Sequence, residues 1–394
     1  MKLYDVVIVG GGPVGSHVAC KLAGMGYKVA VLERKQKVGE QVCCTGVIGQ
    51  ECANSFAIED NVILRRVNSA QLFSPSGNPL RLWREEIQAC ILDRAAFDMA
   101  MARRAQHKGT EYVLDSLVRD IAVEGDRVKI EASHQGEGLT FEARATVIAT
   151  GFGSRLTERL GLGSVGDFVI GAQAEVETAG IDEVEAYFGR EVAPGFFGWL
   201  VPTSSRTARV GLLSRHSPEL YLKKMMASLL AQGKIVSSEA KLSRGGIPLK
   251  PLSRTCSERL LVVGDAAGQV KPTTGGGIYY GLLCAEIAAD TLHQALQRGD
   301  LSAKSLARYD RGWRRRLGQE LKTGYWARKL FEHLSDKQLD RIFDIVKANG
   351  IEDLLKAKDL SFDWHSKAIL MLLGRAVVAK AIGVIKAPAK AGED

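Results

Sequence analysis

The chain has 394 residues, of which 46% are hydrophobic, so it is long enough for two or three domains with buried cores. Its 53 Lys and Arg residues exceed its 45 Asp and Glu residues, which gives a net charge of +8. This balance is compatible with nucleic acid, an anionic membrane or an acidic ligand, and does not choose among them. The seven cysteines are odd in number and none has the C-x-x-C spacing of zinc or dithiol sites, so a reducing cytoplasm is expected.

Signals for export or membrane insertion are not found in the pattern. Met1 leads directly into a strand pattern, which leaves no room for the charged and apolar regions of a signal peptide. No uncharged apolar run reaches the roughly 18 to 20 residues of a membrane span. A folded, soluble-type protein of the cytoplasm is therefore expected.

The first predicted elements form a β-α-β unit. Residues 3–9 (LYDVVIV) are apolar and β-branched, as in a buried parallel strand, and residues 14–25 have helical spacing. Residues 28–33 (KVAVLE) predict a second buried strand. Such a unit is the start of a doubly wound sheet.

A glycine cluster separates the first strand from the helix. Gly10, Gly12 and Gly15 occupy the G-x-G-x-x-G positions, and Glu33 ends the second strand. Free amides and the dipole of a helix N-terminus hold a pyrophosphate where no side chain blocks its approach, and the Glu33 carboxylate would accept ribose hydroxyls. The pattern predicts a dinucleotide site, and the alternative is a structural glycine turn.

The following elements alternate between strands and helices. We expect hairpin strands over about 62–92, a helix at 93–108, strands near 111–123, 127–132 and 139–149, a mainly antiparallel second sheet over 167–213, and a helix at 216–233. A buried strand follows within 259–268, and helices are expected at 279–297, 303 to about 350, and 366–386.

A second glycine-rich segment favours FAD over NAD. RLLVVGDAAG (259–268) ends a strand in Gly264-Asp265, which places a carboxylate where ribityl hydroxyls would lie. PTTGGGI (272–278) then begins a helix with bare amides that suit the electron-rich edge of a flavin. The alternative is a buried capping aspartate before a glycine turn.

These segments resemble flavoproteins of the para-hydroxybenzoate hydroxylase fold. The resemblance rests on GGGPVG with Glu33, the D-R-x-x-F-D stretch from Asp93 to Asp98, ATG at 149–151, and GDAAGQVKPTTGGGIYYG at 264–281. Within that group, the last stretch and PGFFGWLVP (194–202) resemble the geranylgeranyl reductase family. The likeness covers about residues 1–300.

The resemblance implies an α/β (α+β) fold with three parts. A Rossmann-type FAD-binding domain is expected at 1–65, 88–165 and 255–300, an inserted antiparallel-sheet substrate domain at 66–87 and 166–254, and a C-terminal helical region at 301–394. The residues that the resemblance assigns to FAD are Gly10, Gly12, Pro13, Val14, Gly15, Glu33, Arg34, Cys44, Thr45, Gly46, Arg94, Val118, Thr150, Gly151, Gly264, Asp265, Gly276, Gly277 and Ile278. For Arg94 the alternative is a surface ion pair.

The resemblance also implies an activity. Family members saturate carbon–carbon double bonds of a prenyl chain, here on an isoprenoid lipid, a quinone or a diphosphate, and a P-x-x-Y-x-W-x-F-P stretch lines their prenyl cavity. This chain has Phe197 in place of the tyrosine and Val201 in place of the phenylalanine. Phe196, Phe197, Trp199 and Pro202 are the expected cavity residues, and they would exclude water and present π faces to positive charge. The alternative is that these aromatic residues form the core of the second sheet.

Two adjacent cysteines are the candidate catalytic residues. Family members carry a cysteine near the flavin after the first β-α-β unit, and Cys43 or Cys44 aligns with it. A thiol there would supply or relay a proton or report redox state, and the alternative is a pair of small buried side chains. No His or acidic residue lies nearby at ligand spacing, so no metal is expected.

The source of electrons is left open. There is no second G-x-G-x-x-G after a strand, so transiently bound NAD(P)H or a reduced ferredoxin-type carrier would reduce FAD. A flavin monooxygenase of small aromatic compounds, or an electron-transfer flavoprotein that passes electrons to quinone, are the alternative functions.

The C-terminal region suggests a contact with the membrane. Basic residues crowd the helix expected after residue 303, together with Trp313, Tyr325 and Trp326, and the apolar segment 366–386 follows. This combination suits a protein resting on the anionic inner face of the cell membrane, where an isoprenoid lipid would lie. The alternative is a solvated charged helix with a packed C-terminal helix. No nucleic-acid partner is expected, because no recognisable nucleic-acid module carries the basic residues.

Overall fold

The computed structural model describes residues 3–348 and 361–373. The chain forms two compact units, each built from three segments. Unit 1 comprises Met1–Leu64, Ile91–Val169 and Gly245–Lys322, and unit 2 comprises Arg65–Cys90, Ile170–Arg244 and Thr323–Asp394. The three-part division expected from the sequence stays a prediction beside this two-unit arrangement.

Unit 1 begins with the expected β-α-β unit. Strand β1 (Leu3–Val9) is followed by helix α1 (Pro13–Gly24) and strand β2 (Val29–Leu32). β1 and β2 pair in parallel, with Val6 opposite Val29 and Val9 opposite Leu32. All four residues of β2 are buried, which explains why this strand has no polar alternation.

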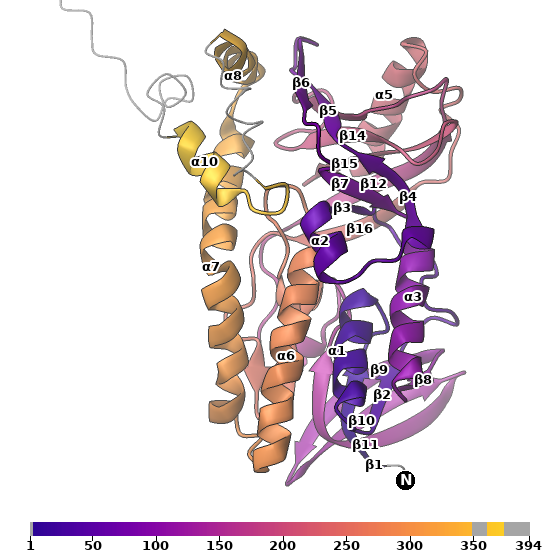
Figure 1. Cartoon of the computed structure of the whole chain (residues 1–394), viewed down its shortest axis with the longest axis vertical. Coiled ribbons are helices and arrows are strands. Elements are labelled where there is room, and N and C mark those ends of the chain that lie inside the picture. Colours follow the sequence, from indigo (N-terminus) through magenta and orange to yellow (C-terminus); the bar gives the residue numbers. More distant parts are fainter. Residues whose placement is uncertain (1–2, 349–360, 374–394) are drawn as a thin grey trace, which may run out of the picture. The chain divides into compact units, whose positions relative to one another are not determined.

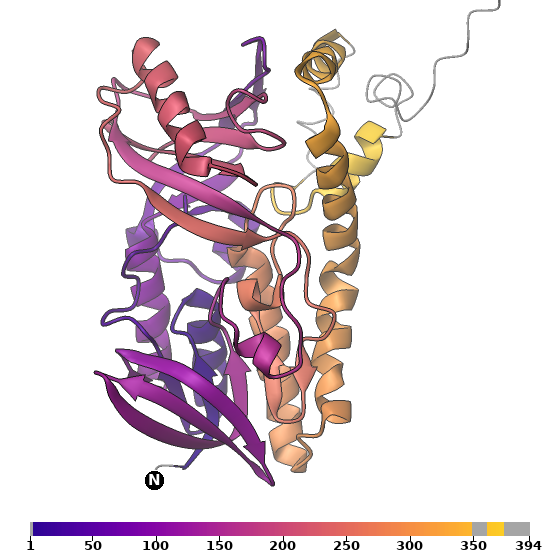
Figure 2. The same ribbon diagram turned by 180° about the vertical axis from the view of Figure 1, so that it is seen from behind.

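The sheet of unit 1 has the strand order β17-β18-β11-β1-β2-β8, and β10 pairs with both β11 and β9. Its further strands are β8 (Glu111–Val113), β9 (Ser116–Glu124), β10 (Arg127–His134), β11 (Glu137–Ile148), β17 (Cys256–Ser257) and β18 (Leu260–Val262). β11 is long enough to pair antiparallel with β10 and in parallel with β1 and β18. Figure 2 shows the β9–β10–β11 strands in front.

Helices of unit 1 pack around α1. In Figure 1, α1 lies between α3 (Arg94–His107) and α6 (Ile278–Arg298). The shorter elements of this part of the chain are β3 (Val47–Gly49), α2 (Gln50–Ser55), η1 (Asp60–Val62), α4 (Leu156–Arg159) and η2 (Gly264–Ala267). The sequence pattern did not predict α2, since six residues are too few to show a helical period.

Unit 2 is built on the expected second sheet, with the strand order β16-β12-β15-β14-β13-β5-β6. Its strands are β5 (Ser69–Phe73), β6 (Pro79–Trp83), β12 (Phe168–Glu177), β13 (Val184–Phe188), β14 (Phe197–Pro202), β15 (Thr207–Ser214) and β16 (Ser243–Pro248). Helix α5 (Pro218–Ala231) covers one face of this sheet (Figure 2). Strands β4 (Ile63–Val67) and β7 (Ala89–Leu92) form a small sheet with β3.

The helix expected from 303 to about 350 is interrupted. α7 (Ala303–His333) ends before Ser335, and α8 (Asp336–Ala348) follows. The Gln338 side chain accepts hydrogen bonds from the amide and hydroxyl of Ser335, and the Ser335 hydroxyl accepts one from the Gln338 amide at 3.4 Å. This reciprocal capping is the reason why a new helix begins here.

The expected C-terminal helix is described only in part. α10 (Ser366–Leu373) covers the first residues of the segment 366–386, and residues from 374 onward lie outside the described residues. Within 3–348 and 361–373, no helix is both long and apolar enough to cross a membrane.

The interfacial role expected for Trp313 is wrong. This side chain is 1% exposed, its Nε1 donates to the Thr255 hydroxyl at 2.8 Å, and the guanidinium of Arg314 lies over its ring. Trp326, on the same helix, is 64% exposed. The aromatic residues of α7 therefore divide between core and surface.

Candidate functional site

The G-x-G-x-x-G stretch, which runs from the end of β1 into α1, has no room for a side chain at two of its three motif glycines. Gly10 has a φ of +110°, and a Cβ there would lie 2.4 Å from the Ala149 carbonyl oxygen. A Cβ on Gly15 would lie 2.1 Å from the carbonyl oxygen of Gly10. A Cβ on Gly12, by contrast, would meet no atom within 4 Å. Gly10 and Gly15 thus shape the turn, and Gly12 leaves its outer side uncovered.

The N-terminus of α1 lies at this uncovered side. Gly12 is the N-cap residue, no side chain caps the helix, and Pro13 takes a first-turn position where its missing N–H costs nothing. Unsatisfied amides and the positive end of the helix dipole therefore face the space next to Gly12. This is the arrangement that binds a pyrophosphate.

Glu33 connects the end of β2 to the same turn. Its Oε2 accepts a hydrogen bond from the Gly11 amide at 2.7 Å, and its Oε1 accepts one from the Lys35 amide at 3.0 Å. The carboxylate is held in place with further lone pairs open to a ribose. The next residue, Arg34, is exposed.

The second glycine-rich segment meets the first inside unit 1. Gly264 has a φ of +67° and opens η2 directly after β18, and a Cβ on it would lie 3.3 Å from Cγ1 of Val14. A Cβ on Gly281 of α6 would lie 2.5 Å from Cγ2 of Val14. Two glycines from the C-terminal half of the chain, Gly264 and Gly281, therefore pack on one side chain of α1.

Asp265 and the start of α6 form the other half of this site. A Cβ on Gly277 would lie 2.5 Å from Oδ1 of Asp265, so only glycine fits below this carboxylate. Gly277 is the N-cap of α6, no side chain caps that helix, and Gly276 and Ile278 lie beside it. Burial raises the pKa of Asp265, and the positive charge of Arg94 opposes this shift. Across the described part of the chain, no group donates a hydrogen bond to the Asp265 side chain.

Two residues that the sequence reasoning missed hold this segment. Gln269 accepts a hydrogen bond from the Gly264 amide at 2.8 Å and donates to the Tyr309 hydroxyl at 2.8 Å. Tyr309 in turn donates to the Val262 carbonyl at 2.8 Å, and both side chains are buried. Gln269 lies inside the quoted motif, but Tyr309 is 40 residues further on and carries no local signal.

Arg94 is buried, so it is not the surface ion pair that was the alternative. Its Nη2 donates to Oδ1 of Asp98 at 2.9 Å, one turn further along α3. Burial opposes its charge, but the neighbouring Cys44 and Asp98 outweigh burial and raise the pKa of Arg94. Its Nε is buried without a partner among the described residues.

The cysteine pair lies in the same unit. Cys44 interacts with Arg94, and its Sγ accepts a hydrogen bond from the Gly46 amide at 3.4 Å across Thr45. Cys43 packs against Gly245, where a Cβ would come within 3.7 Å of its Sγ. Both thiols are half-buried and neither is in a disulfide.

Three further predicted cofactor residues differ in their surroundings. The Thr150 hydroxyl is buried without a partner among the described residues. Gly151 follows it with a φ of +70° and no atom within 4 Å of a Cβ placed there. Val118, on β9, packs into the core of unit 1, so only its backbone is available to a ligand.

The residues of unit 1 fit FAD. Two uncapped helix N-termini, an uncovered Gly12, an acidic residue held at Glu33 and a carboxylate at Asp265 provide the donors and acceptors that a flavin dinucleotide requires. Buried polar atoms of Arg94 and Thr150 add unsatisfied groups. Among the described residues, no group of three His, Cys, Asp or Glu side chains could hold a metal ion.

In unit 2, two of the predicted cavity residues share a face of the sheet. Phe197 and Trp199 alternate along β14 with Gly198, which meets Met225 of α5 on the other face. The rings of Phe197 and Trp199 are 6.0 Å apart, and the Trp199 indole lies directly on Gly211 of β15.

The other two predicted cavity residues lie elsewhere in unit 2. Pro202 is buried and belongs by alternation to the α5 face of the sheet. Phe196 precedes β14 and is 1% exposed, so it is a core residue. For Phe196, the structure therefore agrees with the alternative expectation, in which the aromatic residue belongs to the core of unit 2.

The row of aromatic rings continues beyond β14. Phe188 of β13 lies 5.8 Å from Phe197, 5.9 Å from Phe331 of α7 and 5.8 Å from Phe343 of α8, measured between ring centroids. We call Phe331, Phe188, Phe197 and Trp199 the aromatic row. All four residues belong to unit 2, and their side chains are apolar apart from the indole nitrogen of Trp199.

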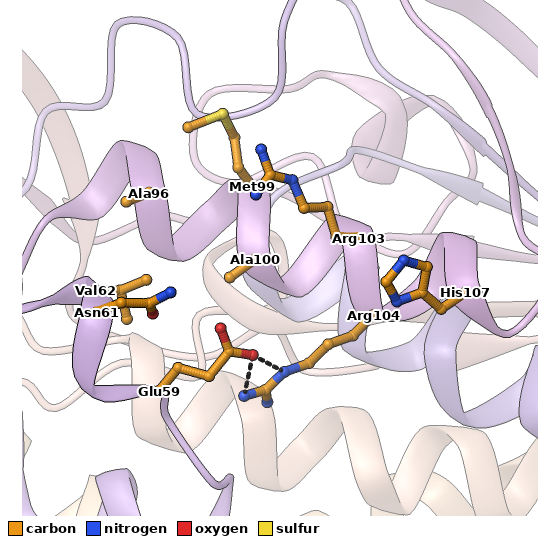
Figure 3. A pocket seen from close by; sticks show the side chains of 9 residues that line it. All are labelled: Glu59, Asn61, Val62, Ala96, Met99, Ala100, Arg103, Arg104 and His107. Atoms are coloured by element: carbon orange, nitrogen blue, oxygen red, sulfur yellow. Dashed lines mark hydrogen bonds and ion pairs between the residues drawn. The ribbon is translucent and has the colours of Figure 1, made fainter.

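A surface pocket of about 230 Å³ lies on α3, away from the predicted cofactor residues. It is lined by Glu59, Asn61, Val62, Ala96, Met99, Ala100, Arg103, Arg104 and His107. Figure 3 shows Arg104 paired with Glu59 at its edge, with an Nη2 to Oε1 distance of 3.0 Å. The α3 residues that line it are on the opposite side of the helix from Arg94 and Asp98, so the pocket is separate from the cofactor site.

Comparison with known proteins agrees with this geometry. Residues 4–185 match the family described as pyridine nucleotide-disulphide oxidoreductase. Digeranylgeranylglycerophospholipid reductase of Methanocaldococcus jannaschii is 31% identical, over 87% of this chain and 90% of that protein. Digeranylgeranylglycerophospholipid reductase 2 of Methanothermobacter thermautotrophicus is 29% identical, over 90% of this chain and 94% of that protein.

A solved structure covers nearly the whole chain. The geranylgeranyl bacteriochlorophyll reductase-like protein of Thermoplasma acidophilum is 25% identical, superposes with a TM-score of 0.85, and covers 98% of this chain and 100% of its own. The expected fold class is therefore confirmed, and so is the resemblance. The chain is a member of the geranylgeranyl reductase family of FAD-dependent oxidoreductases.

Proposed function

We propose that this protein saturates carbon–carbon double bonds in a prenyl chain carried by an isoprenoid lipid. The observation that carries the proposal is the 31% identity to a relative named as a digeranylgeranylglycerophospholipid reductase, 90% of whose length is covered. The aromatic row of unit 2 supports it, because a polyprenyl chain needs an apolar surface of this kind.

Unit 1 has the role of holding FAD, which supplies hydride when it is bound and reduced. The amides beside Gly12 would bind the pyrophosphate, Glu33 would accept from a ribose, and Asp265 would accept from the ribityl chain. The free amides at Gly277 stabilise negative charge at the flavin edge.

Unit 2 has the role of binding the hydrocarbon. An isolated alkene accepts hydride poorly, so partial protonation toward a tertiary cation lowers the barrier. The rings of Phe197 and Trp199 exclude water and offer π faces to that positive charge. The indole position depends on Gly211, because any side chain there would push the ring away.

The proton is assigned to the cysteine pair. Cys43 and Cys44 are half-buried thiols in the cofactor unit, and Arg94 interacts with Cys44. A thiol that protonates one carbon while hydride reaches the other completes the addition of hydrogen across the bond. The thiolate left behind would regain a proton from water, and transiently bound NAD(P)H or a reduced ferredoxin-type carrier would supply the electrons for the next reduction of the flavin.

A peripheral contact with the inner face of the cell membrane is part of this proposal. Trp326, Phe362 and Leu370 of unit 2 are exposed large apolar side chains, of the kind that insert into a lipid interface. Such a contact would bring a lipid substrate to the protein without a membrane span.

An anaerobic turnover assay tests the proposal. The purified protein is incubated with FAD and dithionite and, in separate reactions, with geranylgeranyl phospholipid, geranylgeranyl diphosphate or a prenylquinone. The masses of the products are then measured by mass spectrometry. A gain of hydrogen in the prenyl chain is expected. Unchanged substrates would overturn the proposal. Substrate-dependent oxygen uptake would instead identify a monooxygenase, and quinone reduction with intact prenyl chains would identify an electron-transfer protein.

A further inference from the structure

Unit 2 contains a buried arginine, two of whose nitrogens have no hydrogen-bond partner among the described residues. Arg328 of α7 is 4% exposed, and its Nε and Nη2 are buried with no acceptor among the described residues. Its Cζ lies 3.3 Å from the centre of the Phe196 ring and 5.1 Å from that of Phe331. The guanidinium thus lies against aromatic faces, and its Nε and Nη2 donors are left unsatisfied among the described residues.

The neighbouring carboxylate forms an ion pair with this charge but accepts no hydrogen bond from it. Oε1 of Glu332 is 3.8 Å from Nε of Arg328, which is beyond hydrogen-bond distance, and it already accepts from Nη2 of Arg215 at 2.8 Å. Lys329 also lies near Glu332, with its Nζ 3.7 Å from Oε2. Three cationic side chains therefore surround one carboxylate.

Burying a charged group without hydrogen-bond partners costs free energy. The shift in the pKa of Arg328 reflects this cost. Burial lowers the pKa of Arg328, Glu332 opposes this shift and the positive charge of Arg215 adds to it, and the resulting pKa is about 9. The guanidinium remains protonated at neutral pH. A buried cation with two donor nitrogens that find no acceptor among the described residues is suited to binding an anionic ligand.

The position of Arg328 suggests which ligand this is. Phe331, one of its two aromatic neighbours, is also the first member of the aromatic row. Gly195, with a φ of +70°, brings the loop that carries Phe196 against Glu332. A cationic group therefore lies at one end of an apolar surface within the same unit, which matches a molecule with an anionic head and a hydrocarbon chain.

We propose that Arg328 binds a phosphate group of the substrate and that the attached prenyl chain lies along the aromatic row. This inference rests on the proposed function, and it adds the residue that binds the phosphate and the end of the aromatic row at which the head of the substrate lies. The phosphate belongs either to a lipid headgroup or to a prenyl diphosphate, and both offer the oxygens that a guanidinium binds.

Binding measurements on three variants test this site. Arg328→Met removes the charge and keeps an apolar stem, and Arg328→Lys keeps the charge without the planar donor set. Arg206→Met removes an exposed arginine side chain of unit 2 and is the matched control. The FAD-loaded proteins are titrated with geranylgeranyl phospholipid in detergent, geranylgeranyl diphosphate, geranylgeraniol and inorganic phosphate, and thermal shift and KM are recorded.

We expect Arg328→Met to weaken binding of the preferred phosphorylated prenyl ligand at least tenfold and to raise its KM, with geranylgeraniol unaffected. Arg328→Lys should lie between wild type and Arg328→Met, and Arg206→Met should match wild type. The phospholipid and diphosphate titrations show which source of phosphate is preferred, and inorganic phosphate shows whether the head alone suffices. Equal binding of phosphorylated ligands by wild type and Arg328→Met would overturn the inference.

Two outcomes separate this inference from the proposed function. If wild type reduces no prenyl chain but binds phosphorylated prenyl ligands through Arg328, the proposed function fails and the site remains. If wild type reduces prenyl chains and Arg328→Met does so with an unchanged KM for phosphorylated substrates, the site fails and the proposed function remains. A uniform loss of affinity for all four ligands in both variants would assign Arg328 a structural role.

Discussion

Val14 packs directly against Gly264, with its Cγ1 3.3 Å from the place where a Cβ of Gly264 would lie. The same side chain contacts Gly281 of α6, where the corresponding distance to Cγ2 is 2.5 Å. The helix after the first strand therefore touches both elements of the second glycine-rich segment. This contact brings the two halves of the proposed FAD site together.

The contact predicts a compensating pair of substitutions. Alanine favours a helix over glycine by about 1 kcal/mol, yet Gly281→Ala should destabilise the protein because its Cβ overlaps Val14. Adding Val14→Ala removes the overlap, so the double variant should recover about 1–3 kcal/mol of coupling energy. Urea unfolding of the four proteins measures this. Additive effects of the two substitutions would show that the two segments do not touch.

A substitution at Gly12 should weaken FAD binding without affecting the stability of the apoprotein. A Cβ at this residue meets no protein atom within 4 Å, so Gly12→Ala should leave the unfolding midpoint of the apoprotein almost unchanged. The added methyl group fills the space next to the amides of α1, and FAD affinity should fall at least about tenfold. Fluorescence titration with FAD measures the affinity. Gly166→Ala, where a Cβ is equally unobstructed, is the control and should bind FAD normally.

Asp265 predicts a stability that depends on pH. Burial raises the pKa of this carboxyl from its ordinary value of 3.8, so between 3.8 and the raised value the native state keeps a proton that the unfolded state has lost. Stability falls as the pH rises through this window, so the raised pKa corresponds to a loss of stability in the apoprotein above pH 3.8. Asp265→Asn should therefore raise the melting temperature of the apoprotein at pH 7 and weaken FAD binding.

The comparison of the same two apoproteins across pH is the control for Asp265. Their melting temperatures should converge as the pH falls below 3.8, where the wild-type carboxyl is protonated in both states. A lower melting temperature for Asp265→Asn than for wild type at pH 7 would show that the Asp265 carboxyl does not destabilise the apoprotein.

Gly211 and Gly198 test the aromatic row from opposite faces of one sheet. A Cβ on Gly211 would lie 2.4 Å from the Trp199 indole, so Gly211→Ala should displace the ring, cost about 1–3 kcal/mol of stability and lower prenyl reduction without loss of FAD. A Cβ on Gly198 would meet the flexible end of Met225, 2.6 Å from its sulfur.

Gly198→Ala is therefore the matched control for Gly211→Ala. The Met225 thioether can move aside, so this variant should lose less stability and keep its activity. Urea unfolding, FAD absorbance and the anaerobic assay are compared for the two variants. Equal activity of both would show that the Trp199 face does not bind the prenyl chain.

Local patterns explain how much of the site could be predicted. The turn at Gly10 and the helix start at Gly12 depend on residues a few positions apart, so the spacing of the glycines is enough to recognise them. The unbroken apolar stretch of β2 likewise predicts a buried parallel strand, and the structure confirms it. The burial of a side chain by segments that are distant in the sequence leaves no comparable pattern in the neighbouring residues.

The sequence alone determined the β-α-β unit, the order of most elements and the family, because glycine spacing and hydrophobic period act between near neighbours. Only the tertiary structure decided that Trp313 is buried, that Tyr309 supports the turn at Gly264 through Gln269, and that Arg328 is enclosed by aromatic rings. Whether an aromatic or basic side chain on an amphipathic helix faces the core or the solvent depends on segments far away in the chain. That packing exists only once the sheets have formed.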